Sequence, residues 1–319
     1  MNNQNNLLVV SSSPHVHSAD SVQSAMRDVQ IALIPALFVA LYFFRFSAAL
    51  VIVACVLSAV ISEAATQKLM KKEVTVKDGS AVVTGLLLAF CLPPAISPWI
   101  AAIGAAVAIV LVKQFFGGLG CNIFNPALIG RAFLVAAWPV AMTTWVSPLD
   151  GITTATPLGI IKEGLQQELP SLGQMFLGNV GGCLGETSAL ALLLGGLYLI
   201  YKGHVDWRIP VSYIGSVFVL TAVIGAFQGQ GLSYPVFHIL AGGLFLGAFF
   251  MATDWVTSPI TKKGRIIFGL GCGCLTVLIR LKGGYPEGVC YSILLMNTLT
   301  PLIDRYTKER VFGRVKKHA

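Results

Sequence analysis

Hydrophobic positions along the chain gather into long, nearly uninterrupted blocks separated by short polar segments. The blocks lie at 29–44, 47–65, 80–96, 98–113, 119–138, 185–201, 210–228, 234–252, 265–281 and 287–303. A helix that crosses a bilayer needs roughly 20 apolar residues, and most blocks approach that length. Several are short or rich in glycine, which is typical of broken or re-entrant segments. The pattern predicts an all-α polytopic membrane protein with about ten transmembrane helices.

Two segments in the first part of the chain have similar counterparts in the second part. The stretch "LAFCLPPAISP" (88–98) resembles "GAFFMATDWVTSP" (247–259), and "GGLGCNIFNPALIGRAFL" (117–134) loosely resembles "GGYPEGVCYSILLMNTL" (283–299). Five spans in each part would place the two parts in opposite orientations in the membrane. We therefore expect two inverted five-helix repeats. The first membrane half covers 29–138, the second covers 185–303, and a loop at 139–184 joins them.

Composition agrees with a lipid environment. Hydrophobic residues make up 55% of the 319 residues and charged residues only 11%, whereas a soluble domain carries about 25% charged residues. The polar segment 1–28 is rich in Ser and Asn and does not resemble a cleavable export signal. It predicts a cytoplasmic N-terminal tail, and the basic segment 304–319 predicts a cytoplasmic C-terminal tail.

The distribution of basic residues predicts the orientation of the chain. With the N-terminus inside, the inner segments carry 17 Lys and Arg residues, and the outer ones carry only Arg45, Lys162, Arg280 and Lys282. Cytoplasmic loops of membrane proteins are enriched in Lys and Arg, so both termini are expected in the cytoplasm and loop 139–184 in the periplasm. The net charge of +8 has the same explanation. No basic stripe interleaved with aromatic residues indicates nucleic-acid binding.

Charged side chains inside predicted spans are costly, and each is therefore a candidate for function. They are Glu63, Arg131, Glu186, Asp254 and Glu287. We expect snorkelling or capping to account for Glu63, Asp254 and Glu287, because they lie near predicted span ends. Arg131 lies deeper in its span.

Asparagine and proline interrupt one apolar block at Asn122, Asn125 and Pro126. They predict a broken helix, and unwound backbone in a membrane is tolerated only where it is buried in protein or lines a cavity. The pairs Gly195-Gly196 and Gly242-Gly243 are expected to allow close contact between helices.

Metal-binding and catalytic patterns are weak. The seven cysteines form no C-x-x-C pair, and the closest spacing, Cys272-x-Cys274, suits buried apolar residues better than a metal site. His238 is expected to be a hydrogen-bonded core histidine. No P-loop, zinc spacing or Ser-His-Asp arrangement occurs, so neither a metal site nor a complete catalytic site is predicted in this chain alone.

A compact polar cluster, "DGITTATPLG" (150–159), interrupts the outer loop. Proline is favoured in the first helical turn, so Pro157 predicts a helix that has Thr156 as its N-cap and continues to about residue 169. A capped surface helix accounts for this spacing by itself. A helix N-terminus also offers free N–H groups and the positive end of a dipole, which suit a phosphate carried by the Thr156 hydroxyl.

The cluster Asp150-x-x-Thr153-Thr154-Ala155-Thr156 resembles the flavinylation motif recognised by the periplasmic flavin transferase. Thr154 stands where that motif usually has glycine. The resemblance implies that the transferase uses FAD and joins FMN through its phosphate to Thr156.

Several stretches in order resemble the family that comprises the D-type membrane protein (RnfD) of the Rnf electron transport complex and its B-type counterpart (NqrB) in the sodium-pumping NADH:quinone reductase. They are "SAVVTGLLLAFCLPP", "GGLGCNIFNPALIGRAFL", "GNVGGCLGETSALALLLGGLYLI", "TDWVTSPIT" and "GGYPEGVCYSILLMN", within a resemblance that covers about residues 28–305. The short N-terminal tail is more similar to the D-type members. Under this interpretation, the Arg131 guanidinium either binds a flavin phosphate or pyrimidine edge, or pairs with a helix C-terminus.

The resemblance implies an inner-membrane subunit that relays electrons through covalent FMN, with the flavin supplying the redox chemistry. The complex would couple electron flow between ferredoxin and NAD to sodium or proton movement. Implied partners are the other Rnf subunits, among them a periplasmic covalent flavoprotein, and the flavin transferase. The related B-type members leave room for a second, noncovalent flavin. The alternative is a channel or transporter of urea-channel-like architecture without redox activity, and the coupling ion is left open.

Overall fold

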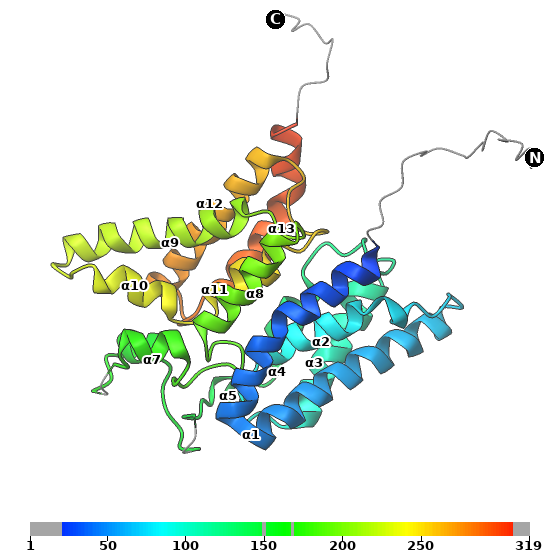
Figure 1. Ribbon diagram of the computed structural model, residues 1–319, viewed down its shortest axis with the longest axis horizontal. Coiled ribbons are helices and arrows are strands. Elements are labelled where there is room, and N and C mark those ends of the chain that lie inside the picture. Colours follow the sequence, from blue (N-terminus) through cyan, green and yellow to red (C-terminus); the bar gives the residue numbers. More distant parts are fainter. Residues whose placement is uncertain (1–20, 149–150, 167–168, 309–319) are drawn as a thin grey trace, which may run out of the picture.

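The computed structural model describes residues 21–148, 151–166 and 169–308, and over these residues it consists of helices joined by loops (Figure 1). A single isolated bridge between Val146 and Thr153 is the only strand-like pairing within those ranges. The predicted all-α membrane fold is confirmed.

The first half is built on a long helix that turns back on itself. α1 (Val22–Leu69) is broken at Arg45, where a φ of 49° and a ψ of −124° interrupt the helical geometry. Its two arms correspond to the first two apolar blocks. The elements that follow are η1 (Val76–Asp78), α2 (Ser80–Phe90), α3 (Pro98–Val107), the π-helix η2 (Ala108–Gln114), α4 (Pro126–Ala137) and α5 (Pro139–Thr143).

The second half also contains a broken helix. Its elements are α8 (Ala189–Tyr201), α9 (Arg208–Phe227), α10 (Ser233–Leu240), α11 (Leu244–Leu246), the π-helix η3 (Gly247–Met251), α12 (Lys262–Lys282) and α13 (Val289–Tyr306). The segments 233–240 and 244–251 meet at an angle of 64°. Gly242 has a φ of 72° at this break. The pair Gly242-Gly243 therefore makes a turn, and a Cβ atom at Gly242 would lie only 3.0 Å from the Leu158 side chain and 3.1 Å from that of Arg280 in α12. Its role in close contact between helices stays a prediction.

Two short helices, α6 (Pro157–Glu163) and α7 (Leu172–Leu177), lie in the segment that joins the halves. Figure 1 places α7 at the lower left, on the side opposite to the beginning of α1 and the end of α13. The two ends of the helical region thus share one side of the molecule, and the joining segment lies on the other.

Only some of the predicted spans are long enough in the structure to cross a membrane. Among the described residues, α1, α9 and α12 are long and apolar enough, and the bent pair 233–240 and 244–251 would make a fourth. The apolar helices 80–90, 98–114, 126–137 and 189–201 are shorter. The count of ten spans and the inverted repeat stay predictions.

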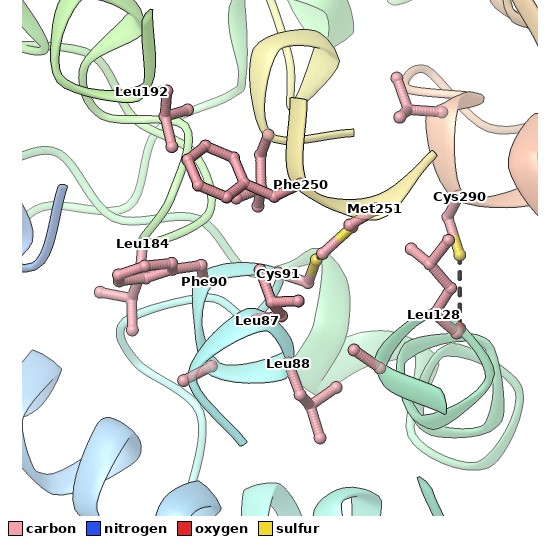
Figure 2. Close-up of a cluster of buried hydrophobic side chains, with 14 of the residues drawn as sticks. Leu87, Leu88, Phe90, Cys91, Leu128, Leu184, Leu192, Phe250, Met251 and Cys290 are labelled. Carbon is pink, nitrogen blue, oxygen red and sulfur yellow. Dashed lines mark hydrogen bonds between the residues drawn. The ribbon is translucent and has the colours of Figure 1, made fainter. Parts of the chain in front are cut away.

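The broken helices of both halves meet in one hydrophobic core (Figure 2). The Cys91 thiol, just after α2, lies 4.0 Å from the Met251 sulfur at the end of η3. The Cys290 thiol in α13 donates to the carbonyl oxygen of Leu128 in α4 at 3.5 Å. The central packing therefore joins segments that are more than a hundred residues apart.

Glycine lets α8 approach its neighbours closely, as predicted for Gly195-Gly196. A Cβ atom at Gly195 would lie 2.1 Å from the carbonyl oxygen of Ala32 in α1, and one at Gly196 would lie 2.4 Å from the Phe249 ring. α1 and α8 could not keep this separation with any larger residue at position 195.

We expect Gly195→Ala to lower the free energy of unfolding by roughly 1–3 kcal/mol, because overpacking forces the backbones apart. Thermal unfolding of the purified protein in detergent measures the effect. Gly215→Ala in α9 is the matched control, because nothing lies within 4 Å of the added methyl group. Its unfolding temperature should be unchanged or raised, since alanine is the better helix former. Equal unfolding temperatures for Gly195→Ala and wild type would contradict the close contact.

Candidate functional site

Thr156 is the N-cap of α6, as predicted. Its Oγ1 accepts a hydrogen bond from the Gly159 N–H at 3.1 Å, and its backbone is extended, with φ −69° and ψ 154°. The helix ends at Glu163, followed by Gly164 in the left-handed conformation, so it is shorter than predicted. The Thr156 residue is 4% exposed. This hydroxyl is therefore held in one position by the start of the helix.

A tight turn presents the residues that precede Thr156. The Ser147 N–H donates to the Ile152 carbonyl at 2.7 Å, and the Thr154 N–H donates to the Trp145 carbonyl at 3.0 Å. Thr153 is exposed, and Thr154 and Ala155 are half-buried. Asp150 lies outside the described residues.

Beside α6 lies a small cavity of ≈ 10 Å³. It is lined by Pro157, Met175, Val180, Gly181, Glu186, Leu240, Ala241 and Gly242. A volume of about 10–15 Å³ holds a single water molecule. The residues around Thr156 can therefore provide an attachment oxygen, but a flavin ring joined there would have to extend beyond this cavity.

The polar contacts of Arg131 do not involve the flavinylation motif. The Arg131 guanidinium forms an ion pair and a hydrogen bond with the carboxylate of Glu287, in the loop before α13. Its partner is thus a side chain of the second half and not a helix C-terminus. The prediction that snorkelling or capping accounts for Glu287 is wrong, because this residue is 9% exposed and pairs with Arg131. A role of Arg131 in flavin binding stays a prediction.

A large cavity of ≈ 330 Å³ opens beside the beginning of α1. The break before α4, predicted from Asn122 and Asn125, lines it. Asn125 caps α4 through its Oδ1, which accepts from the Ala127 N–H at 3.0 Å, and its Nδ2 donates to the Met251 carbonyl at 3.2 Å. The prediction of a broken, cavity-lining segment is confirmed, and Asn125 links it to η3 of the other half.

Further polar residues of this cavity were not singled out from the sequence. They are Ser80, Thr84, Lys113, His204, Thr253 and Trp255, and they lie beside Asp254, which the sequence did single out. The Asp254 carboxylate accepts hydrogen bonds from the Thr257 hydroxyl at 3.1 Å and from the Asn122 amide at 3.4 Å. These residues come from both halves, so their proximity has no local signature in the sequence.

A buried ion pair joins η2 to the second arm of α1. The Lys113 Nζ lies 2.7 Å from the Glu63 Oε1, with side-chain exposures of 2% and 1%. Lys113 also donates to the Ser80 Oγ at 2.5 Å, and the Gln114 Nε2 donates to the same Glu63 oxygen at 2.8 Å. A π-helix is wider than an α-helix, and such segments are frequent at functional sites. Snorkelling or capping of Glu63 is therefore wrong, as is the placement of Lys113 in a loop.

His238 is a core histidine, but it is not hydrogen-bonded as predicted. Its two ring nitrogens are buried and have no hydrogen-bond partner among the described residues. The imidazole packs edge-on against Tyr234, with ring centroids 4.5 Å apart. Arg280, which was counted with the outer loops, is also buried, at 5% exposure within α12.

One group of potential metal ligands occurs within the described ranges, although no metal site was predicted. The Cys183 sulfur and one carboxylate oxygen each from Glu186 and Glu287 all lie within 4.8 Å of one another. No spacing signal marks this group along the chain, because Glu287 is about a hundred residues from the other two.

Membrane-length helices, broken helices that meet at the centre and ion pairs buried inside the apolar region define the chain as a polytopic membrane protein. The chain belongs to the NQR2, RnfD, RnfE family, whose family model matches residues 9–313.

Curated relatives match over nearly the whole chain. The D subunit of a proton-translocating ferredoxin:NAD(+) oxidoreductase complex from Clostridium ljungdahlii is 53% identical, with 97% of each chain covered. The D subunit of a Na(+)-translocating ferredoxin:NAD(+) oxidoreductase complex from Acetobacterium woodii is 52% identical, with 98% of each covered. The D subunit of an ion-translocating oxidoreductase complex from Aliivibrio salmonicida is 36% identical, covering 96% of this chain and 99% of the relative.

Lys113→Met should destabilise the protein by about 3–5 kcal/mol, because it leaves the Glu63 carboxylate buried without its cation. Glu63→Gln in the same chain should restore much of that loss, because it removes the unpaired charge. Unfolding of the two single variants and the double variant in detergent completes a double-mutant cycle. Additive effects of the two substitutions would contradict a direct ion pair.

Proposed function

We propose that this chain is the D-type membrane subunit of an ion-translocating ferredoxin:NAD oxidoreductase complex, and that it relays electrons through FMN attached covalently to Thr156. The attachment rests on one observation: the last threonine of the flavinylation motif is the N-cap of α6, directly after a tight turn. The family membership and the names of the relatives support the assignment to the complex.

The local geometry suits a phosphoester at the Thr156 oxygen. Pro157 has no N–H group, and the Gly159 N–H already donates to Oγ1, which leaves the Leu158 N–H without a partner over the described residues. This end of α6 also carries the positive part of its dipole. Bound FMN supplies one- and two-electron redox chemistry, and this chain contributes its attachment and orientation. Because the adjacent cavity is small, the flavin ring would face away from the core, toward a partner subunit.

The large cavity is our candidate site for a second, noncovalent flavin. Its volume of ≈ 330 Å³ falls within the range of roughly 300–1,000 Å³ of small-molecule sites. Most of its lining is apolar, while the Asn122 amide, the Lys113 ammonium and the Asp254 carboxyl offer hydrogen bonds to a polar ring edge. The two flavin positions would then lie near opposite sides of the molecule.

The remaining assignments follow from the same proposal. The chain lies in the bacterial inner membrane with both termini in the cytoplasm and the α6–α7 segment in the periplasm. Its partners are the other Rnf subunits, including a periplasmic covalent flavoprotein, and the flavin transferase that modifies Thr156. The large cavity and the broken helices also favour a second candidate, a channel or transporter of urea-channel-like architecture, which would carry no covalent flavin.

Thr156→Val preserves the shape of the side chain and removes the hydroxyl, so the attached FMN should be lost. Intact mass should fall by one FMN group, and flavin fluorescence of the denatured chain on a gel should disappear. Thr153→Val is the control, because Thr153 is exposed on the same turn and is not the acceptor. It should retain at least part of the label. Any flavin in the large cavity should be released by denaturation from wild type and Thr156→Val alike.

Full labelling of Thr156→Val would contradict the attachment. Absence of flavin from wild-type protein made with an active transferase would favour the channel or transporter.

A reporter that is active only in the periplasm should give no signal when it is fused after Ala319, because the basic residues hold the C-terminus in the cytoplasm. The same reporter inserted after Gly164 should be active. Gly164 is an exposed position at the end of α6, and it has open space around it. Strong activity of the fusion at Ala319 would reverse the orientation and place Thr156 out of reach of the transferase.

A further inference from the structure

The hydroxyl of Thr156 is shielded in the folded chain. Thr156 is 4% exposed, and the first turn of α6 is buried as well, at Pro157, Leu158, Gly159 and Ile160. In the attachment step, Oγ1 forms a bond to the FMN phosphorus of FAD, the bond from that phosphorus to AMP breaks, and the hydroxyl proton is transferred away as AMP leaves. Because the attacking and leaving oxygens lie roughly in line through the phosphorus, the transferase needs open space beside Oγ1. The position of α6 in the structure does not provide that space.

The contact that holds α6 against its neighbours is small and apolar. Leu158 packs with Met175 of α7, with Phe237 of α10 and with Ala241 just after α10, in a cluster separate from the main hydrophobic core. α7 and α10 are themselves in contact (Figure 1). The docking of α6 thus depends on one leucine side chain that fits between two short helices.

The hydrogen bonds of α6 stay almost entirely within its own segment. The Gly159 N–H donates to the Thr156 Oγ1 at 3.1 Å. Over the described residues, a single hydrogen bond joins 156–165 to other parts of the chain, from the Lys162 Nζ to the Tyr285 carbonyl at 2.7 Å. It is exposed, so water can replace it. The cap therefore moves with the helix, and the N–H groups that suit a phosphate stay beside Thr156 when α6 leaves its neighbours.

The segment before α6 is fixed more firmly than α6 itself. The Thr154 N–H donates to the Trp145 carbonyl at 3.0 Å. The Thr154 side chain also packs closely on Gly181, where an added Cβ atom would lie 2.4 Å from its methyl carbon. At the other end of α6, Gly164 has a φ of 60° and open space around it. Ala155 and Gly164 are therefore the positions at which α6 can turn away from α7 and α10.

We propose that α6 undocks from α7 and α10 as a unit to accept FMN at Thr156, and that the attached group then prevents it from docking again. The cavity beside Pro157 has a volume of ≈ 10 Å³, which is about the space of a single water molecule. A phosphate with its ribityl chain cannot enter that space, so the modified chain holds α6 away from the docked position. The inference deepens the proposed function and rests on it, because it describes how the same attachment site becomes accessible.

Flavin transfer to the purified, unmodified full-length chain by a purified transferase and FAD tests the undocking. Leu158→Ala removes most of the apolar contact that is lost on opening, so labelling should be faster by roughly tenfold or more. Ile161→Ala is the matched control, because Ile161 is 40% exposed on the same helix. Its labelling rate should equal that of wild type. Met175→Ala weakens the same contact from α7 and decides the outcome if Leu158→Ala does not fold.

Hydrogen exchange of the peptide that covers α6 measures the opening without the transferase. An isolated helix of seven residues is marginal in water, so the amides of α6 should exchange faster when it leaves its neighbours. Exchange should be roughly tenfold faster in unmodified Leu158→Ala than in unmodified wild type, and it should also be faster in wild type after labelling. The peptides of α9 are the internal reference and should not change.

Equal labelling rates for wild type, Leu158→Ala and Met175→Ala would overturn the undocking. Equal exchange of α6 before and after labelling would overturn its displacement in the product. In both cases, label on Thr156 leaves the flavin attachment itself intact. Absence of label from every variant contradicts the attachment, and the undocking that rests on it is then wrong as well.

Discussion

A helix that stops inside a bilayer leaves carbonyl groups that no water can reach, and this constraint organises the chain. At the end of α2, the Phe90 carbonyl accepts a hydrogen bond from the Gly185 N–H at 2.8 Å. At the end of α10, the guanidinium of Arg280 donates to the carbonyls of His238 and Ala241. Each of these helix ends is therefore completed by a segment distant in sequence: α2 by the end of the segment that joins the halves, and α10 by α12 of its own half.

The segment that joins the halves contributes both to the core and to the attachment site. Its end enters the core and satisfies α2 through Gly185, while its middle forms α6 with Thr156 at the N-cap. The cavity beside Pro157 is closed by Glu186 and by the break at Gly242. A group attached to Thr156 would thus be positioned by the same backbone that closes the centre of the molecule, which links its placement to the packing between the halves.

Hydropathy and helix capping depend on short stretches of chain. The features that they determine could therefore be predicted from the sequence. The apolar blocks, the break at Asn125 and the cap at Thr156 are of this kind. Partnerships between distant residues could not be predicted. Glu63 and Lys113 lie near the ends of their blocks, where water is the expected neighbour, yet η2 turns Lys113 inward. Glu287 likewise gives no local sign of its partner in α4, because ion pairing within a membrane depends on tertiary packing.

Because α1 turns at Arg45, the number of residues in each arm determines which side chains face the core. Its two arms are separated by a single non-helical residue, so no loop is available to absorb an insertion. One residue added to the second arm would rotate everything after it by about 100° around the helix axis. Glu63 would then face away from Lys113, and a carboxylate would be turned toward apolar surroundings. Evolution can exchange side chains on this hairpin, but it cannot easily add or remove a residue.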